Sequence, residues 1–245
     1  MRTFWYCVAA LVLAASAGTA LAVEVITLRS GQHLGSPGAV GDLDDTITYN
    51  PWGNPVREPV LGRVLVAADF AATAAGQHAT IVLPHAAWMG GQTAPLSDPL
   101  ARWINFGTLP SGEGTAGSAL YAVPFFVNST TIAIATLQIE GGVDDALGDG
   151  LGATNPDGLY INGIGSGLTS PPGFNFATPT THFLDITDKI HPGQNYLYFN
   201  QRDAGAGYAG LIFRATIEVV PEPSSSGLAA MGTLFALGRR RRKAE

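Results

Sequence analysis

The sequence predicts an all-β protein, most simply an antiparallel β-sandwich, and three observations support this. The chain has 31 glycines and 16 prolines, which divide it into many short segments rather than a few long helices. No segment shows a sustained helical spacing of apolar residues. One run near the C-terminal end alternates between apolar and polar positions, as a half-buried strand does. Its apolar positions are Leu211, Phe213, Ala215, Ile217 and Val219.

Further strands are expected where β-branched and aromatic residues gather between glycines and prolines. Residues 159–161 form one such run, and the Asn162-Gly163 pair that follows is typical of a tight hairpin turn. About eight to ten short strands in one sandwich would account for the pattern. The other main expected strands are residues 24–28, 60–68, 79–83, 121–127, 130–139 and 196–199.

The length fits one domain between two terminal targeting segments. The chain has 245 residues, and we expect a signal peptide at 1–22, a β-sandwich domain at 23–219 and a sorting segment at 220–245. About 200 residues is an ordinary size for a single-core β-sandwich.

The folded part of the chain is acidic. From Val23 to Pro223 it contains 7 lysines and arginines against 18 aspartates and glutamates, which gives a net charge of −11. Nucleic acids and anionic lipids need a basic face on their partner, so this charge argues against both. Acidic loops suit calcium or neutral glycans better.

The first 22 residues are typical of a secretory signal peptide. Arg2 precedes an apolar run at 8–17, and Ala20 and Ala22 place small residues at the two positions that signal peptidase reads. The alternative is an N-terminal membrane anchor, which the short run disfavours. The single cysteine, Cys7, lies in this segment, so the mature chain would have no thiol and no disulfide.

The last 25 residues combine a proline motif, a short apolar segment and a basic block. Prolines stop the preceding strand, and a block of arginines would be too costly to desolvate in a core. This order resembles the PEP-CTERM sorting signal of Gram-negative bacteria. The motif residues are Val220, Pro221, Glu222, Pro223 and Ser224, and the basic residues flanking the membrane are Arg239, Arg240, Arg241 and Arg242.

The resemblance implies that the exported chain is held in the inner membrane and then processed by an exosortase. Residues 224–238 would span about 22 Å as a helix, against roughly 30 Å of hydrocarbon, which suits a transient anchor. The arginines would stay on the cytoplasmic side. The domain would then lie outside the cytoplasm, in the cell envelope, at the cell surface or in the extracellular matrix, with signal peptidase and exosortase as processing partners.

Four aspartates in and beside a glycine-rich loop are the best metal candidates. Crowded carboxylate oxygens in a flexible loop are ligands that Ca²⁺ prefers, but Leu147 stands where an EF-hand loop needs a ligand. A structural turn therefore stays open as the alternative. A catalytic carboxylate pair is disfavoured, because it would need a cleft that raises one pKa. The four candidates are Asp144, Asp145, Asp149 and Asp157.

Two tryptophans precede the central strands. An exposed indole can stack on the apolar face of a sugar ring, and we take Trp88 as the candidate for glycan stacking. Trp103 is expected in or at the edge of the core, which is the commoner place for this residue type.

Several segments between Trp103 and Val219 resemble, in their order, the galactose-binding-like jelly roll. This β-sandwich occurs in accessory domains of glycosidases and in surface lectins, and its end loops often bind glycans or a structural calcium. The matching segments are residues 101–104, 121–127, 135–139 with 144–145, 159–163, 185–187 and 193–199.

The favoured function is a non-catalytic carbohydrate-binding module that binds extracellular polysaccharide. One alternative is a structural or adhesive matrix component without a specific ligand, and another is a polysaccharide-active hydrolase. The chain has no Gly-x-Ser-x-Gly, no His-Glu-x-x-His and no catalytic cysteine, so we expect no enzyme activity.

Overall fold

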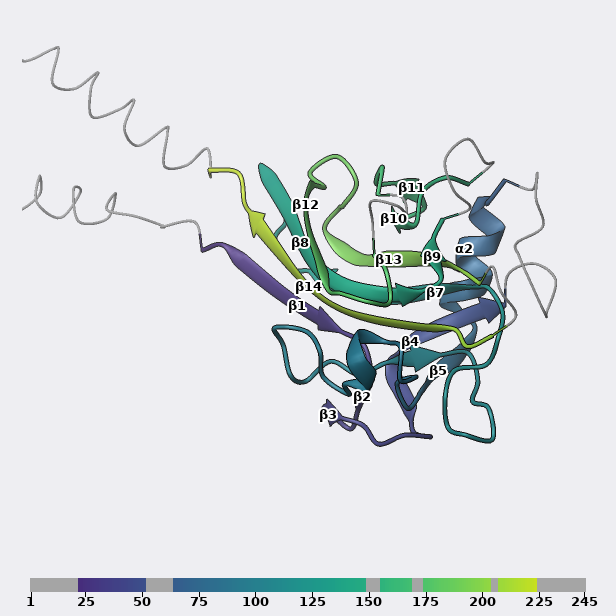
Figure 1. Ribbon diagram of the computed structural model, residues 1–245. Coiled ribbons are helices and arrows are strands. Elements are labelled where there is room, and N and C mark those ends of the chain that lie inside the picture. The colour runs from purple at the N-terminus through teal and green to yellow at the C-terminus, as the bar shows by residue number, and fades with distance from the viewer. Residues whose placement is uncertain (1–21, 52–63, 149–154, 169–173, 204–206, 224–245) are drawn as a thin grey trace, which may run out of the picture.

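The computed structural model describes residues 22–51, 64–148, 155–168, 174–203 and 207–223. All strand pairs in this part of the chain are antiparallel, which confirms the expected all-β antiparallel class. One 12-stranded sheet curls over on itself, and a small hairpin lies beside it (Figure 1).

The sheet strands are β1 (Glu24–Arg29), β4 (Leu43–Pro51), β5 (Gln77–Ile81), β6 (Ile104–Asn105), β7 (Ala119–Val127), β8 (Ile134–Asp144), β9 (Ala146–Leu147), β10 (Leu159–Ile161), β11 (Ile164–Gly165), β12 (Thr180–Asp185), β13 (Gly193–Arg202) and β14 (Gly210–Val220). The hairpin pairs β2 (Gln32–His33) with β3 (Ser36–Pro37), and the described helices are α2 (Ala67–Ala74) and a 3₁₀ turn at Met89–Gly91.

The curled sheet forms two layers around one core. The first layer follows the order β11-β10-β13-β7-β4, and the second follows β14-β8-β12, with β1 on the other side of β14. Short strands β5 and β6 join the two layers. Phe199 of β13 and Phe213 of β14 meet between them, with ring centroids 4.5 Å apart and both side chains fully buried. The arrangement is therefore a sandwich of the expected kind.

The two-residue period of each strand decides which side chains reach the core. On β13, Asn195, Leu197 and Phe199 point inward, so Gln194, Tyr196 and Tyr198 face outward from the first layer. On β14 the five apolar residues predicted for the core are all fully buried, while Thr216 and Glu218 face outward from the second layer. The outer faces of these two strands thus carry polar and aromatic side chains on β13 and polar side chains on β14.

A helix stands where the sequence predicted a strand. Within the run 60–68, residues 60–63 lie outside the described part, 64–66 form no strand, and α2 begins at Ala67. Five of its eight residues are alanine, the residue with the highest helix propensity. Asp69 also accepts a hydrogen bond from the Val66 backbone N–H at 2.9 Å, which satisfies one donor at the helix start. Local propensity therefore outweighs the β-branched Val64 and Val66.

The hairpin turn at Asn162-Gly163 is confirmed. The two residues have φ angles of 51° and 82°, and they join β10 to β11. Positive φ at both central residues is the signature of the primed turn that Asn-Gly favours.

Both ends of the domain leave from the same edge. Glu24 of β1 is the register partner of Val219 of β14, four residues before Pro223 (Figure 1). The Glu24 carboxylate accepts hydrogen bonds from the backbone N–H groups of Asn128 and Ser129 at 2.9 and 3.0 Å, which fastens the first strand to the loop after β7. The expected signal peptide and the end of the sorting segment lie outside the described residues.

Candidate functional site

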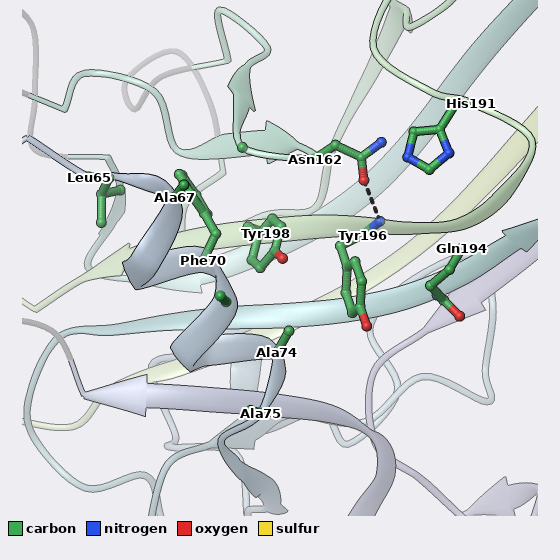
Figure 2. Close-up of a pocket in the computed structure, with 12 residues that line it drawn as sticks. Leu65, Ala67, Phe70, Ala74, Ala75, Asn162, His191, Gln194, Tyr196 and Tyr198 are labelled. Atoms are coloured by element: carbon green, nitrogen blue, oxygen red, sulfur yellow. Dashed lines mark hydrogen bonds between the residues drawn. The ribbon is translucent and has the colours of Figure 1, made fainter.

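A hollow of about 700 Å³ opens on the outer face of the first layer, between α2 and β13 (Figure 2). One side is apolar and comes from the helix and the residues before it, including Leu65, Phe70 and Ala74. The other side comes from β13 and the β10–β11 turn. Its lining side chains are Asn162, His191, Gln194, Tyr196 and Tyr198.

Two stacked tyrosines form the floor of this hollow. Tyr196 and Tyr198 stand two residues apart on β13, so both rings lie on the outer face, with centroids 5.7 Å apart and planes inclined by 25°. Burial, with a smaller contribution from Tyr196, raises the pKa of Tyr198 to about 12. The Tyr198 hydroxyl is therefore neutral at physiological pH.

Phe70 of α2 holds the inner tyrosine in place. Its ring centroid lies 4.8 Å from that of Tyr198 in an edge-on arrangement, and 5.3 Å from that of Tyr160 on β10. Phe70, Tyr160 and Tyr198 are all buried, whereas Tyr196 is only half-buried at the open end of the hollow. The helix thus fixes one ring of the stack and leaves the other accessible.

The polar rim is fixed by backbone hydrogen bonds. Asn162 Oδ1 accepts from the Tyr196 N–H at 2.9 Å, and the Asn162 N–H donates to the Tyr196 carbonyl at 2.9 Å (Figure 2). Gln194 Nε2 donates to the carbonyls of Phe125 and Asn195, both at 3.0 Å. The rim side chains Gln194 and His191 are exposed.

The exposed ring of Phe126 extends this aromatic surface. Phe126 of β7 is the register partner of Gln194, faces outward with it, and is 55% exposed. Pro124 lies opposite Tyr196 in the same register. Together these residues make a flat, largely uncharged platform that suits a ring with one apolar face and hydroxyl groups around its edge. None of the described residues that line the hollow carries a carboxylate.

The structure places Trp88 in the core, so the expectation of glycan stacking on this ring is wrong. Its exposure is 0%, and its ring lies 4.7 Å from that of Trp103, which is also buried as predicted. Gly210 makes room for the pair, because a Cβ there would lie 2.6 Å from the Trp88 ring. Neither indole face is available to a sugar.

Asp144 is held by the same tryptophan. The Trp88 indole N–H donates to Asp144 Oδ2 at 2.5 Å, and the Asp144 carbonyl accepts from Gln201 Nε2 at 2.7 Å. Burial chiefly, with the neighbouring Asp145 and Asp203 carboxylates adding to it, raises the pKa of Asp144 to about 7. This carboxyl group therefore has a structural role, because it accepts a hydrogen bond from the buried Trp88 at the end of β8.

The described metal candidates do not gather into one site. Asp157 Oδ1 accepts from the Gly167 N–H at 2.5 Å, which fastens the loop after β11, while Asp144 ends β8 and Asp145 follows it. Among the described residues, no three His, Cys, Asp or Glu side chains are placed to share a metal ion. Asp149 lies outside the described residues, so a calcium role there stays a prediction.

Sequence reasoning missed the tyrosine platform. The signal available was the alternation Gln194-x-Tyr196-x-Tyr198, which places polar and aromatic side chains together on one face of a strand. The pattern alone could not show that a helix more than 120 residues earlier in the chain would form the other wall.

Comparison with known proteins gives limited similarity for the domain. A β-glucuronidase from an uncultured Clostridium species is 10% identical with a TM-score of 0.36, over 82% of this chain and 30% of that protein. The CBM36-1 domain of a multidomain xylanase, from the hindgut metagenome of Trinervitermes trinervoides, is 13% identical with a TM-score of 0.28, over 57% and 95% of the two chains. The chain thus spans less than a third of the β-glucuronidase. No curated protein matches it.

The C-terminal end gives a specific match. Residues 219–243 match the PEP-CTERM protein-sorting motif, which includes all the predicted motif and basic residues. Within the described residues, no helix has the length and apolar character needed to cross a membrane. The chain carries a PEP-CTERM sorting motif, and this motif indicates an exported protein that is sorted to the cell envelope.

Proposed function

We propose that this protein is a non-catalytic carbohydrate-binding module, processed by an exosortase and displayed at the cell surface or in the extracellular matrix. The observation that carries the proposal is the Tyr196–Tyr198 stack, which floors a hollow with exposed amide and imidazole groups at its rim. The export indicated by the sorting motif would bring this surface into contact with extracellular polysaccharide.

The chemistry of the hollow suits a pyranose. The C–H groups on one face of a sugar ring pack on an aromatic ring, while its hydroxyl groups exchange hydrogen bonds with amide side chains. Tyr196 supplies the accessible aromatic face, and Gln194 and His191 supply exposed polar groups beside it. Burial of one sugar ring on one tyrosine would contribute on the order of 1–2 kcal/mol, so we expect weak binding per sugar unit.

The charge of the protein favours a neutral glycan. The net charge of −11 between Val23 and Pro223 would repel a polyanionic chain. Among the described residues that line the hollow, no lysine or arginine offsets this repulsion.

The described residues that line the hollow carry no carboxylate, and this supports binding rather than hydrolysis. Most glycosidases act through two carboxyl groups that flank the scissile bond. We therefore propose that the module holds polysaccharide without cleaving it.

The test is retention of the mature chain on immobilised neutral polysaccharides, compared with a Tyr196→Ala variant. Phe176→Ala is a matched control, because Phe176 is an aromatic residue of similar partial exposure that does not line the hollow. We expect Tyr196→Ala to weaken binding about tenfold, and Phe176→Ala to leave it unchanged. Parallel runs with Ca²⁺ and with chelator would reveal a metal requirement.

Two results would overturn the proposal. Equal retention of wild type and Tyr196→Ala would remove the tyrosine platform as the binding site. No retention of the folded wild type on any neutral glycan would favour the alternative of a structural matrix component without a specific ligand.

A further inference from the structure

A second, smaller hollow of about 220 Å³ lies on the outer face of the other layer, across β12, β8 and β14. Phe183, Gln138 and Thr216 are cross-strand partners in one row, and Thr136 and Glu218 are partners in the next. These five residues line the hollow within the described part of the chain.

Phe183 is the most unusual of these residues. Its side chain is 75% exposed, although it stands on a regular strand of a well-packed sheet. The neighbouring strand supplies Gln138 and Thr136, so the ring is bordered by hydrogen-bonding groups rather than by other apolar side chains. An accessible aromatic ring beside hydrogen-bonding side chains is what the tyrosine platform also presents, although the second hollow differs from it in carrying a carboxylate, that of Glu218.

We propose that this hollow is a second glycan subsite and that the domain therefore cross-links polysaccharide chains. The inference rests on the proposed function, because it assumes that the Tyr196 platform binds the same class of ligand. One pyranose ring would stack on Phe183, while its hydroxyl groups contact Thr136, Gln138 and Thr216. Among the described lining residues Glu218 alone is charged, which disfavours an anionic sugar and provides a strong acceptor for hydroxyl groups.

The two subsites face in opposite directions. Tyr196 points outward from β13, and Thr216 points outward from β14, while Phe199 and Phe213 of these same strands meet in the core between them. Packed sheets stand about 10 Å apart, and each subsite lies a further side-chain length outside its sheet. A straight glycan chain that contacts one face cannot also contact the other. Double occupancy therefore joins two chains, or two distant parts of one chain.

Bivalence would also compensate for weak single sites. Once one subsite has bound a glycan in a dense matrix, the effective concentration of further glycan near the other subsite is high. The combined affinity therefore exceeds that of either subsite alone. An extracellular matrix supplies such a density of ligand. A module of this kind would stiffen the matrix in addition to remaining attached to it.

The test compares wild type with Tyr196→Ala, Phe183→Ala and the double variant, using beads coated with the neutral polysaccharide that wild type binds. Both binding to single beads and clumping of beads are measured. Phe183→Ala should still bind beads but lose clumping, and the double variant should lose both. Thr216→Val, which keeps the shape but removes one hydrogen-bonding group, should reduce clumping in part. Phe183 is largely exposed, so its replacement should leave the fold intact, which circular dichroism would check.

The outcomes separate this inference from the proposed function. If Phe183→Ala clumps beads as well as wild type, the second subsite is wrong while the Tyr196 site stands. If wild type binds but never clumps beads, the cross-linking inference is likewise wrong. Light scattering of the free protein is the last measurement. If wild type is a dimer and Phe183→Ala is a monomer, self-association would explain the clumping, and the inference would be overturned. If wild type binds no neutral glycan, both proposals are overturned together.

Discussion

Trp88 and Asp144 form a hydrogen-bonded pair that ties the buried tryptophan cluster to the end of β8. The indole N–H donates to the carboxylate at 2.5 Å, although the two residues lie 56 positions apart in the chain. One favourable hydrogen bond offsets only part of the cost of placing this carboxyl group near Asp145 and Asp203. Burial of this carboxyl group, which the hydrogen bond from Trp88 offsets only in part, therefore makes the stability of the fold depend on pH.

The free energy of unfolding should fall as pH rises from the ordinary pKa of Asp144, 3.8, to its folded pKa of about 7. The folded group has a pKa of about 7 against an ordinary value of 3.8, so the folded state holds a proton that the unfolded state releases. The loss of stability is absent below about pH 4 and complete above about pH 7. After allowance for its partial exposure, the loss should be about 1–2 kcal/mol.

Asp144→Asn should remove this pH dependence and stabilise the protein at pH 8, because its amide oxygen still accepts from Trp88. Urea unfolding of both proteins between pH 4 and pH 8 measures the difference. The comparison cancels His182, whose pKa is lowered by burial and whose effect on stability has the opposite sign. Asp188→Asn, at an exposed carboxyl group, serves as the control. Parallel pH profiles for wild type and Asp144→Asn would contradict the assignment.

Phe70→Ala should detach α2 from the sheet and weaken glycan binding. The ring packs on Tyr198 and Tyr160, and truncating a buried phenylalanine costs about 3 kcal/mol or more. Loss of this wall also frees Tyr198, so affinity should fall even where the protein remains folded. Urea unfolding and polysaccharide retention measure the two effects. Ala72→Gly, at an exposed helix position, should cost only about 1 kcal/mol and keep affinity.

Asp44→Ala should destabilise the domain by about 3 kcal/mol. Asp44 is fully buried, and its carboxylate accepts from the backbone N–H groups of Gly31, Thr46 and Ile47 at 2.7 to 2.9 Å. These donors lose their partner in the variant. Asp45→Ala, next in sequence and exposed, should change stability by less than about 1 kcal/mol. Thermal unfolding gives both values, and equal effects would contradict the structural role of Asp44.

Replacing both Pro221 and Pro223 with alanine should block processing and leave the precursor in the membrane fraction. The sheet ends at Val220, so the folded domain should be unchanged. Mass spectrometry of fractionated cells measures the intact C-terminal end. Glu245→Gln, which lies beyond the matched residues 219–243, should be processed normally. Normal processing of the double proline variant would contradict the assigned motif.

The sequence predicted best where local chemistry decides the structure. Alternation along β14 placed Leu211 and Phe213 correctly in the core, and Asn162-Gly163 specified its turn without help from the rest of the chain. Helix α2 was missed because it is only eight residues long and its flanking valines favour strands.

The candidate site was harder to predict because it depends on distant contacts. The burial of Trp88 depends on Gly210, which lies 122 positions further along the chain. Tyr196 gains its role from α2 and from the Asn162 turn, which reach it only in the folded sheet. Residue type alone therefore favoured Trp88 as the residue that stacks on a sugar, whereas the packing of the folded chain favours Tyr196.

The pairing of Glu24 with Val219 also determines how the domain would carry mechanical load. A pull on the C-terminal end of the domain, while glycans hold its faces, would load β14 along the direction of the strand. Register partners run along all 11 of its residues on β8 and along six on β1. Such a pull loads these hydrogen bonds together, in shear, instead of opening them one by one. If the proposed surface display and glycan binding hold, the C-terminal strand would therefore bear such a load through many hydrogen bonds at once.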